Sequence, residues 1–275
     1  MHTINRRLIV SAKDQRLELA HFLRKNRERV TPKDVGLPTG SRRRTPGLRR
    51  EEVAILAGLS PTWYTYLEQA RDIAPSPAAL ERVATVLRLS SYERQYLRRL
   101  SERSRQSSHA SEGNDQTENQ WTRIVESLNP VPAYVTTCLC DIISWNEAAD
   151  EWYSDFSELA KERRNIVLWM LTSPVSRKCF VDWETEAREL VARFRTAAVG
   201  WYGDPRLTEL IENLNESSPH FRRWWEEHHV LGPNTRSSKM RNTRTEIIDM
   251  TIIDLYIGHP NGEKIVIHVP ATHTG

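Results

Sequence analysis

The sequence predicts two folded domains of different class: an all-α domain, followed by an α+β domain with an antiparallel sheet and a helical layer. Three observations predict this arrangement. The net charge changes sign along the chain, a polar stretch lies where it changes, and patterns typical of strands occur only after that stretch. A chain of 275 residues is long enough to form two hydrophobic cores.

Positive charge is concentrated in the first part of the chain. Of the 39 Lys and Arg residues, 22 lie in residues 1–105, against 11 of the 36 Asp and Glu residues. This part therefore has a net charge of +11, and the remainder has −8. Such a separation indicates a basic domain that meets a polyanion. A chance distribution of solvated charges is the alternative interpretation.

A polar stretch separates the two parts. Residues 101–120 are rich in Ser, Gln, Asn and Glu and show no apolar periodicity. They cannot bury enough surface to offset the entropy lost on ordering. We therefore expect a helical domain over residues 1–105, a linker over 106–120 and a second domain over 121–275.

Five helices are expected in the first domain. Apolar residues at helical spacing predict the first over about residues 14–28. The following stretch, residues 30–47, holds three Pro and three Gly and is expected to be non-helical. Ser76 and Pro77 give a start signal for the fourth helix, and Ser91 is expected to cap the fifth.

The second and third helices, within residues 48–69, have the pattern of a helix-turn-helix. Ala54 allows two helices to cross closely, Gly58 permits a tight turn, and Leu59 places an apolar side chain in that turn. Ser60 is an N-cap for the second helix of the pair, which in such motifs lies in the major groove of DNA. An ordinary helical hairpin is the alternative, but the basic surroundings favour DNA binding.

Two sets of residues are candidates for DNA contacts. Exposed side chains near the start of the third helix are expected to read base edges: Pro61, Thr62, Trp63, Thr65 and Tyr66. Nearby basic residues are expected to contact phosphates or an adjacent minor groove: Arg42, Arg43, Arg44, Arg49, Arg50 and Arg71. A solvated charge run is the alternative interpretation of the three adjacent arginines.

The second domain combines strands and helices. Two β-like runs lie within residues 131–145, and two more, at 245–257 and 264–269, flank a turn around Asn261-Gly262 that favours a hairpin. A long helical region between these pairs is interrupted near three prolines, Pro174, Pro205 and Pro219. These elements predict an antiparallel sheet that carries a helical layer.

The chain resembles the MmyB-like branch of Xre-type regulators. The run DVGLPTGSRRRTPGLRREEVAILAGLSPTWYTYLEQ (34–69) is similar to an extended motif of that branch, and the resemblance continues through PVPAYV (130–135), DWETEARELVARFR (182–195) and SPHFRRWWEEHHV (218–230). It covers all but the first dozen residues and the linker, and implies a PAS-like second domain. Three positions depart from the pattern. Ala70 replaces a usual Gly, so the third helix is expected to lack a left-handed end, and Tyr66 replaces a common Arg, which leaves base preference open. Asn242-Thr243 stands where His-Pro is frequent, which leaves the identity of the ligand open.

The resemblance implies a small apolar or amphipathic ligand, of fatty-acyl type, in the second domain. That domain holds eight of the nine Trp residues, and aromatic side chains between a sheet and helices often line a pocket. The candidate pocket residues are Trp145, Asn146, Arg164, Asn165, Trp169 and Trp183. Arg164 or Arg177 is a candidate partner for a carboxylate head group. Filling of the core or of a dimer interface is the alternative role for the aromatic residues.

No enzyme or metal-site pattern occurs in the sequence. Adjacent helical residues such as His228 and His229 point about 100° apart, and Cys138 and Cys140 have no matching pair of ligands. No P-loop, dinucleotide fingerprint or catalytic triad is present, so we expect neither an enzyme nor a cofactor. Three cysteines, and no apolar run near the ~20 residues that span a bilayer, predict a cytoplasmic protein without a membrane partner.

These features predict a ligand-responsive transcription regulator. Because one helix-turn-helix makes few base contacts, we expect a homodimer on double-stranded DNA, at an inverted repeat with half-sites about one helical turn apart. A ligand would act by binding the DNA-competent and incompetent states with different affinities. The alternative makes the second domain a ligand-free dimerisation or protein-interaction module. An enzyme with an incidental helix-turn-helix is a third hypothesis, supported only by the size of the second domain.

Overall fold

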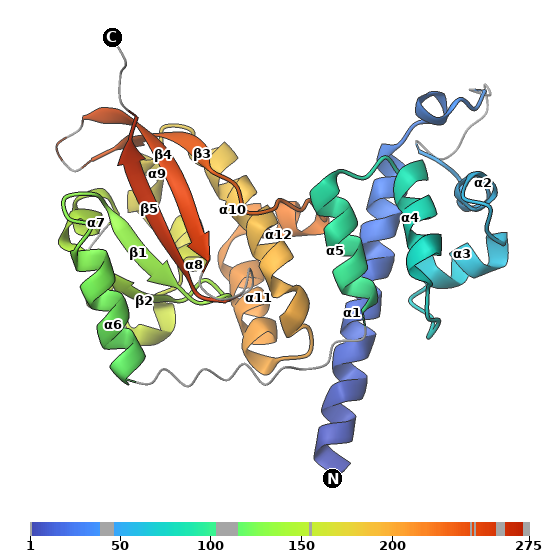
Figure 1. Cartoon of the computed structure of the whole chain (residues 1–275), viewed down its shortest axis with the longest axis horizontal. Coiled ribbons are helices and arrows are strands. Elements are labelled where there is room, and N and C mark those ends of the chain that lie inside the picture. The colour runs from blue at the N-terminus through green and yellow to red at the C-terminus, as the bar shows by residue number, and fades with distance from the viewer. Residues whose placement is uncertain are drawn as a thin grey trace. The chain divides into compact units, whose positions relative to one another are not determined.

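The chain divides into two compact units in a computed structural model that describes residues 2–38, 47–102, 115–153, 156–242, 244, 246–256 and 262–271 (Figure 1). Unit 1 comprises residues 1–105 together with 199–208 and 227–231. Unit 2 comprises residues 106–198, 209–226 and 232–275. The division therefore crosses the chain at several points, whereas we expected a single linker.

Helices make up most of the described part of unit 1: α1 (His2–Arg29), α2 (Arg50–Leu56), α3 (Pro61–Glu68), α4 (Pro77–Val86) and α5 (Ser91–Ser101). The predicted all-helical class is confirmed. The first helix is longer than expected, because it begins at His2. The fifth is capped by Ser90, not by Ser91 as expected, since the Ser90 hydroxyl accepts the Glu93 backbone N–H at 3.3 Å.

The apolar faces of these helices meet in one core. Phe22 and Leu23 of α1, Val53 of α2 and Tyr64 of α3 are each fully buried there. Burial of each large apolar side chain contributes about 1.5–3 kcal/mol. The core therefore fixes α2 and α3 against α1, and α1 contacts both α3 and α5.

The non-helical stretch after α1 is partly described. Pro32–Val35 forms one 3₁₀ turn, which Gly36 ends in the left-handed region at φ 74°. Residues 39–46, and with them the predicted contacts Arg42–Arg44, lie outside the described residues. At Gly47 a Cβ atom would lie 2.3 Å from the backbone oxygen of Arg27, so only glycine fits where the chain passes the end of α1.

Unit 2 contains a five-stranded antiparallel sheet. Its strands are β1 (Ala133–Thr136), β2 (Ile142–Trp145), β3 (Arg236–Arg241), β4 (Ile247–Tyr256) and β5 (Lys264–Pro270), in the order β2-β1-β5-β4-β3. The predicted α+β class is confirmed, as are the two predicted pairs of strands. The third strand, RSSKMR, was not predicted because its polar sequence has no β-like alternation. The predicted hairpin turn lies largely outside the described residues.

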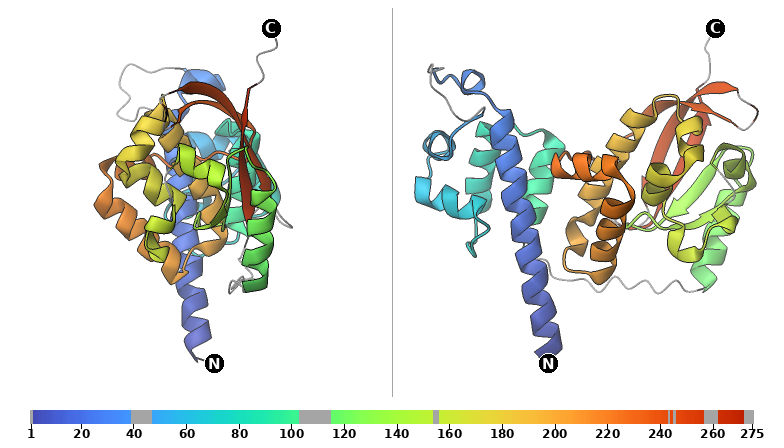
Figure 2. Two further views of the ribbon diagram at one scale, coloured as in Figure 1. Left: turned by 90° about the vertical axis from the view of Figure 1, so that its left-hand side faces the viewer. Right: turned by 180° about the vertical axis from the view of Figure 1, so that it is seen from behind.

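Helices cover both faces of this sheet (Figure 2). On one face α6 (Asp115–Glu126) packs on β1 and β2. Its first residues were predicted as linker, because the apolar residues of this helix start only at Trp121. The connection from β2 to β3 is helical: α7 (Glu147–Trp152), α8 (Ile166–Thr172), α9 (Pro174–Cys179), α10 (Trp183–Ala197), α11 (Pro205–Ser217) and α12 (Pro219–Glu226). Side chains of α10 face the other side of the sheet.

The end of α3 gives a prediction about stability. Ala70 adopts the left-handed region, with φ 56°, and its N–H donates to the Leu67 carbonyl at 3.2 Å. The expected loss of a left-handed end is therefore wrong: alanine adopts this conformation at a steric cost that glycine avoids. Ala70→Gly should stabilise unit 1 by about 1 kcal/mol in urea unfolding.

The same substitution at Ala78 is the matched control. Ala78 is exposed in the first turn of α4 and does not have a positive φ. Glycine there only adds freedom to the unfolded chain, so Ala78→Gly should destabilise the protein slightly. Equal effects of the two variants would contradict the interpretation of Ala70.

Candidate nucleic-acid interface and ligand pocket

A tight turn joins α2 and α3 in the manner of a helix-turn-helix. Ala54, which is fully buried, accepts the Leu59 N–H through its carbonyl at 2.8 Å. Gly58 adopts φ 62°, a left-handed conformation that most other residues enter at a cost. The Ser60 hydroxyl then accepts the Trp63 backbone N–H at 3.1 Å and starts α3. The turn residues thus fix the direction in which α3 leaves.

The outer side of α3 carries the residues predicted to read bases. Pro61 and Thr62 are exposed, and Thr65 and Tyr66 are half-buried. Trp63 is also half-buried and packs partly against the core, so only part of its ring is accessible. The structure brings all five side chains to one helix, while Tyr64, Leu67 and Glu68 point inward.

One buried carboxylate holds α3 to its neighbours. Glu68 of α3 has no exposed side-chain surface and accepts hydrogen bonds from Arg27 of α1 at 2.6 and 3.1 Å and from Arg50 of α2 at 2.7 Å. Arg27 also donates to the Leu48 carbonyl at 2.7 Å. We call Glu68, Arg27 and Arg50 the Glu68 clamp, because it joins the three helices that set the helix-turn-helix geometry.

The clamp keeps its carboxylate ionised. Burial alone would raise the pKa of Glu68, but the hydrogen bonds from Arg27 and Arg50, together with the positive charge of Arg27, outweigh burial and lower it. The pKa of Arg27 is raised: burial would lower it, and its bonds to Glu68 more than compensate. Arg50, predicted to contact phosphate, therefore has an intramolecular partner.

The other predicted phosphate contacts are more accessible. Arg49 is exposed directly before α2, and its backbone N–H donates to Glu52 at 2.7 Å. The Arg71 guanidinium lies 4.0 Å from the centre of the Tyr66 ring and donates to Gln69 at 3.1 Å. This stacking joins one predicted phosphate contact to one predicted base reader.

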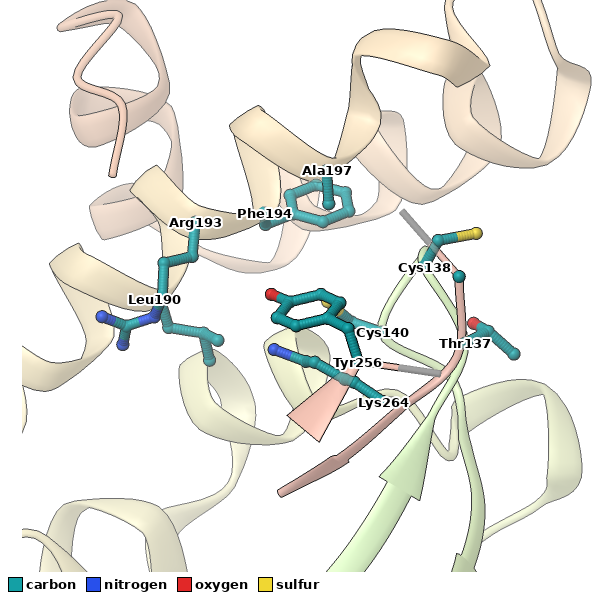
Figure 3. A pocket seen from close by; sticks show the side chains of 10 residues that line it. Thr137, Cys138, Cys140, Leu190, Arg193, Phe194, Ala197, Tyr256 and Lys264 are labelled. Atoms are coloured by element: carbon teal, nitrogen blue, oxygen red, sulfur yellow. The ribbon is translucent and has the colours of Figure 1, made fainter. Parts of the chain in front are cut away.

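Unit 2 has a small cavity between α10 and the sheet (Figure 3). Its volume is about 30 Å³, and its apolar walls come from Leu190, Phe194, Ala197 and the ring of Tyr256. Its polar lining includes Thr137, Arg193 and Lys264. We call it the Lys264 cavity. A space of this size holds about one or two water molecules, so a larger ligand would have to displace side chains.

A second cavity, of about 20 Å³, shares Leu190 and Arg193 with the first. We call it the His268 cavity. Its walls include the aromatic residues Tyr134, Tyr153 and Phe180 with His268. The Tyr153 hydroxyl lies 2.5 Å from His268 Nε2, whereas His268 Nδ1 is buried without a hydrogen-bond partner among the described residues.

Buried cations outnumber buried anions around these cavities. Asp254 accepts hydrogen bonds from Arg236 at 3.1 Å and Lys264 at 2.7 Å. Arg193 is only 7% exposed and donates to the half-exposed Glu189 at 3.0 Å. The Nε atoms of Arg193 and Arg236 are buried without partners among the described residues. Buried N–H groups without partners are costly, so this region has capacity for an anion.

The pKa values follow from these charges. Burial alone would raise the pKa of Asp254, but the charges of Lys264 and Arg236 hold it at about 2. Burial and the charge of Arg236 lower the pKa of His268 to about 3, so its ring is neutral at pH 7. Burial raises the pKa of Glu186, against the opposing effects of a hydrogen bond from Ser238 and the charges of Arg236 and Arg193. Burial likewise raises the pKa of Cys140 to about 12, which makes its thiol unreactive.

Comparison with known families decides what the two units are. A family model described as MmyB-like transcription regulator ligand binding domain matches residues 118–274, and a helix-turn-helix domain model matches residues 18–97. The chain belongs to the MmyB-like transcription regulators. No curated protein matches the chain. This MmyB-like regulator therefore combines a DNA-binding domain with a ligand-binding domain.

The candidate pocket residues that the sequence suggested have other partners in this MmyB-like regulator. None of Trp145, Asn146, Arg164, Asn165, Trp169 and Trp183 lines the Lys264 or the His268 cavity. Both asparagines cap helices: the Asn146 side chain accepts the Ala149 N–H, and that of Asn165 accepts two N–H groups of α8.

The remaining four have structural contacts as well. Arg164 donates to two backbone carbonyls and lies 5.6 Å from the Trp145 ring centre. Trp169 packs in an aromatic cluster with Tyr153, and the Trp183 ring N–H donates to the Met170 carbonyl. The Arg177 guanidinium stacks 3.8 Å from the Trp183 ring centre, which gives this candidate head-group partner an intramolecular role.

Sequence reasoning missed the charged residues of the cavities. Arg193 lies in an ordinary amphipathic helix, and Arg236 in a strand that the sequence did not reveal. Asp254 and Lys264 lie in predicted strands, and the alternation of β4 placed Asp254 on the same face as the buried Met250 and Ile252. A charged residue at an inward position of a strand was the one available signal.

The Glu68 clamp yields a prediction about stability. Glu68→Gln removes the negative charge without changing the shape, so the two arginines lose their buried anion and the free energy of unfolding at pH 7 should fall by about 3 kcal/mol. Urea unfolding measures this change. Glu81→Gln is the control, since Glu81 pairs with Arg94 and Arg98 at the surface, where a pair contributes less than about 1 kcal/mol.

The difference in stability between the wild type and Glu68→Gln should depend on pH if it comes from the ionised carboxylate of Glu68. Because the pKa of Glu68 is lowered in the folded state, the stabilisation is complete above the ordinary glutamate pKa of 4.5. It is lost as the pH falls through the lower, folded-state pKa. The gap in stability between the wild type and Glu68→Gln should therefore narrow in acid. A gap that stays constant with pH would contradict an ionised clamp.

Proposed function

We propose that the protein is a sequence-specific DNA-binding regulator that acts as a homodimer in the cytoplasm, on an inverted repeat, under control of an anionic amphipathic ligand. The observation that supports DNA reading most directly is α3: the five predicted base readers lie on it with at least part of each side chain accessible, on a helix held by the Glu68 clamp. Two copies double the base contacts that one short helix makes. No described helix has the length and apolar character needed to cross a membrane.

Base reading and backbone contact are assigned to different residues. Thr62, Thr65 and Tyr66 offer hydroxyl groups and, in the threonines, methyl groups that match thymine. Arg49 and Arg71 supply positive charge beside α3, and Arg42–Arg44 are proposed to contact phosphates or a minor groove. The net charge of +11 over residues 1–105 favours association with DNA of any sequence.

This assignment predicts different effects for two groups of variants. Arg42→Ala, Arg43→Ala and Arg44→Ala together should weaken binding to all duplexes and flatten its salt dependence, because each lost phosphate contact lowers the slope of log K against log salt by about 0.9. Thr62→Ala or Thr65→Ala should instead change preference at particular base pairs by about 1–3 kcal/mol. Selection from a random duplex library, followed by anisotropy titrations at several salt concentrations, measures both effects. An unchanged salt slope in the triple variant would exclude that loop from the DNA.

For unit 2 we propose a PAS-like fold that binds its ligand between α10 and the sheet. The Lys264 and His268 cavities meet at Leu190 and Arg193, so displacement of these two side chains would join them into one pocket. The joined pocket would have apolar and aromatic walls. Arg193 and Lys264, with their excess positive charge, suit a carboxylate head group. We infer an acyl-type chain from the family resemblance. We infer a negatively charged head group from the buried cations.

The ligand hypothesis is tested by comparing acids with alcohols. Straight-chain carboxylic acids should raise the Tm of the full protein more than alcohols of equal chain length, since only the acids pair with Arg193 and Lys264. Saturation to about one hundred times Kd adds about 2.7 kcal/mol of stability. Arg193→Gln should remove the advantage of the acid and keep the response to the alcohol. Arg188→Gln, on an exposed position of the same helix, is the control.

An alternative function for unit 2 is a ligand-free dimerisation or protein-interaction module. One observation favours it: Ile247, Leu255 and Val269 are between 36% and 53% exposed on β4 and β5. Exposed apolar side chains on one face of a sheet are typical of an interface. Native mass spectrometry of the purified protein separates the two functions. A retained small molecule favours the ligand site, whereas a ligand-free dimer that no acid stabilises favours the module.

A further inference from the structure

A wide groove lies between the end of α1 and the first turns of α2 and α3. Its volume is about 790 Å³, and all of its lining belongs to unit 1. The residues that line it are Arg24, Arg27 and Glu28 of α1, Arg49, Arg50 and Glu51 around the start of α2, and Pro61, Thr62 and Thr65 of α3. We call it the α1–α3 groove. It is continuous with the proposed base-reading side of α3, because Pro61, Thr62 and Thr65 belong to both.

The four arginines of this groove are not equivalent. Arg27 and Arg50 donate to Glu68, and this carboxylate is fully buried behind the groove. Glu68 therefore neutralises one of their two positive charges, and both side chains are held in place. With Glu68 counted, the four arginines of the groove face three carboxylates, those of Glu28, Glu51 and Glu68, which leaves one net positive charge.

Among the described residues, the hydrogen-bonding capacity of Arg24 is not fully used. Its side chain is half-buried, and its Nε atom is buried without a hydrogen-bond partner among those residues. It lies one turn before Arg27 on the same face of α1, and Arg27 is fixed by Glu68 and by the Leu48 carbonyl. A guanidinium that is partly desolvated on a rigid helix loses little entropy when it binds an oxyanion.

We infer that the α1–α3 groove binds one phosphodiester of the DNA backbone, with Arg24 as its donor from a helix outside the helix-turn-helix. This inference rests on the proposed DNA-binding function. The contact would set the depth and register of α3 in the major groove, because Arg24 and the first turn of α3 line the same groove. It carries no sequence information of its own, so Arg24 is a positioning residue for the base readers.

Arg24→Gln tests this contact, with Lys25→Gln as the matched control. Lys25 is the next residue of α1, is exposed and does not line the groove, so both variants remove one charge at nearly the same place. Binding of the full protein to a fluorescent random-sequence duplex is titrated at several salt concentrations. Arg24→Gln should weaken binding several-fold and reduce the slope of log K against log salt by about 0.9, as expected for one phosphate. Lys25→Gln should leave the slope unchanged.

A second measurement separates a direct contact from a general charge effect. Ethylation of single phosphates in a selected high-affinity duplex should interfere with wild-type binding at one position where Arg24→Gln shows no interference. Circular dichroism and Tm establish that the variant is folded. Equal slopes for the wild type and Arg24→Gln, or equal losses in both variants, would overturn the inference. If the wild type showed no salt-dependent binding to any duplex, the proposed function itself would fail instead.

Discussion

The bonds of the buried Glu68 carboxylate to Arg27 and Arg50 are the constraint on which the DNA-binding unit depends. They join α1, α2 and α3. Of these helices, α2 and α3 are too short to be stable in water by themselves. Apolar packing brings these helices together but is non-directional. Charged hydrogen bonds of fixed geometry define one arrangement among the many that packing allows.

This constraint also divides the arginines of unit 1 by role. Those that donate to Glu68 hold the scaffold, whereas Arg24, Arg49 and Arg71, which have no bond to this carboxylate, are proposed to contact DNA. Sequence alone gives no basis for the division, since Arg49 and Arg50 are adjacent and chemically identical. Arg49 is exposed, whereas Arg50 reaches the buried carboxylate. The predicted phosphate contacts thus include one residue whose main interaction is internal.

Unit 2 buries more positive charge than its buried carboxylate compensates. As in the Glu68 clamp, one carboxylate, that of Asp254, binds two cations, but Arg193 is buried beside them with only the half-exposed Glu189 as its partner. Buried ions that lack full compensation reduce stability and are retained where they serve a function. The Lys264 and His268 cavities are small in this structure, so binding of any larger molecule requires α10 side chains to move. Such movement links occupancy of the site to the packing of a helix.

The sequence by itself determined the class of both domains, the helix-turn-helix and the starts of α3 and α4, because these follow from local signals: serine caps, glycine at Gly58, prolines at helix starts and the periodicity of apolar residues. It also placed the base-reading candidates on α3. Only the tertiary structure decided which charges meet. Glu68 lies 41 positions from Arg27, and Lys264 reaches Asp254 only through the pairing of β4 with β5. Burial and pairing of polar groups depend on contacts distant in sequence, and that is why the cavity residues and the role of Arg50 were not predictable from it.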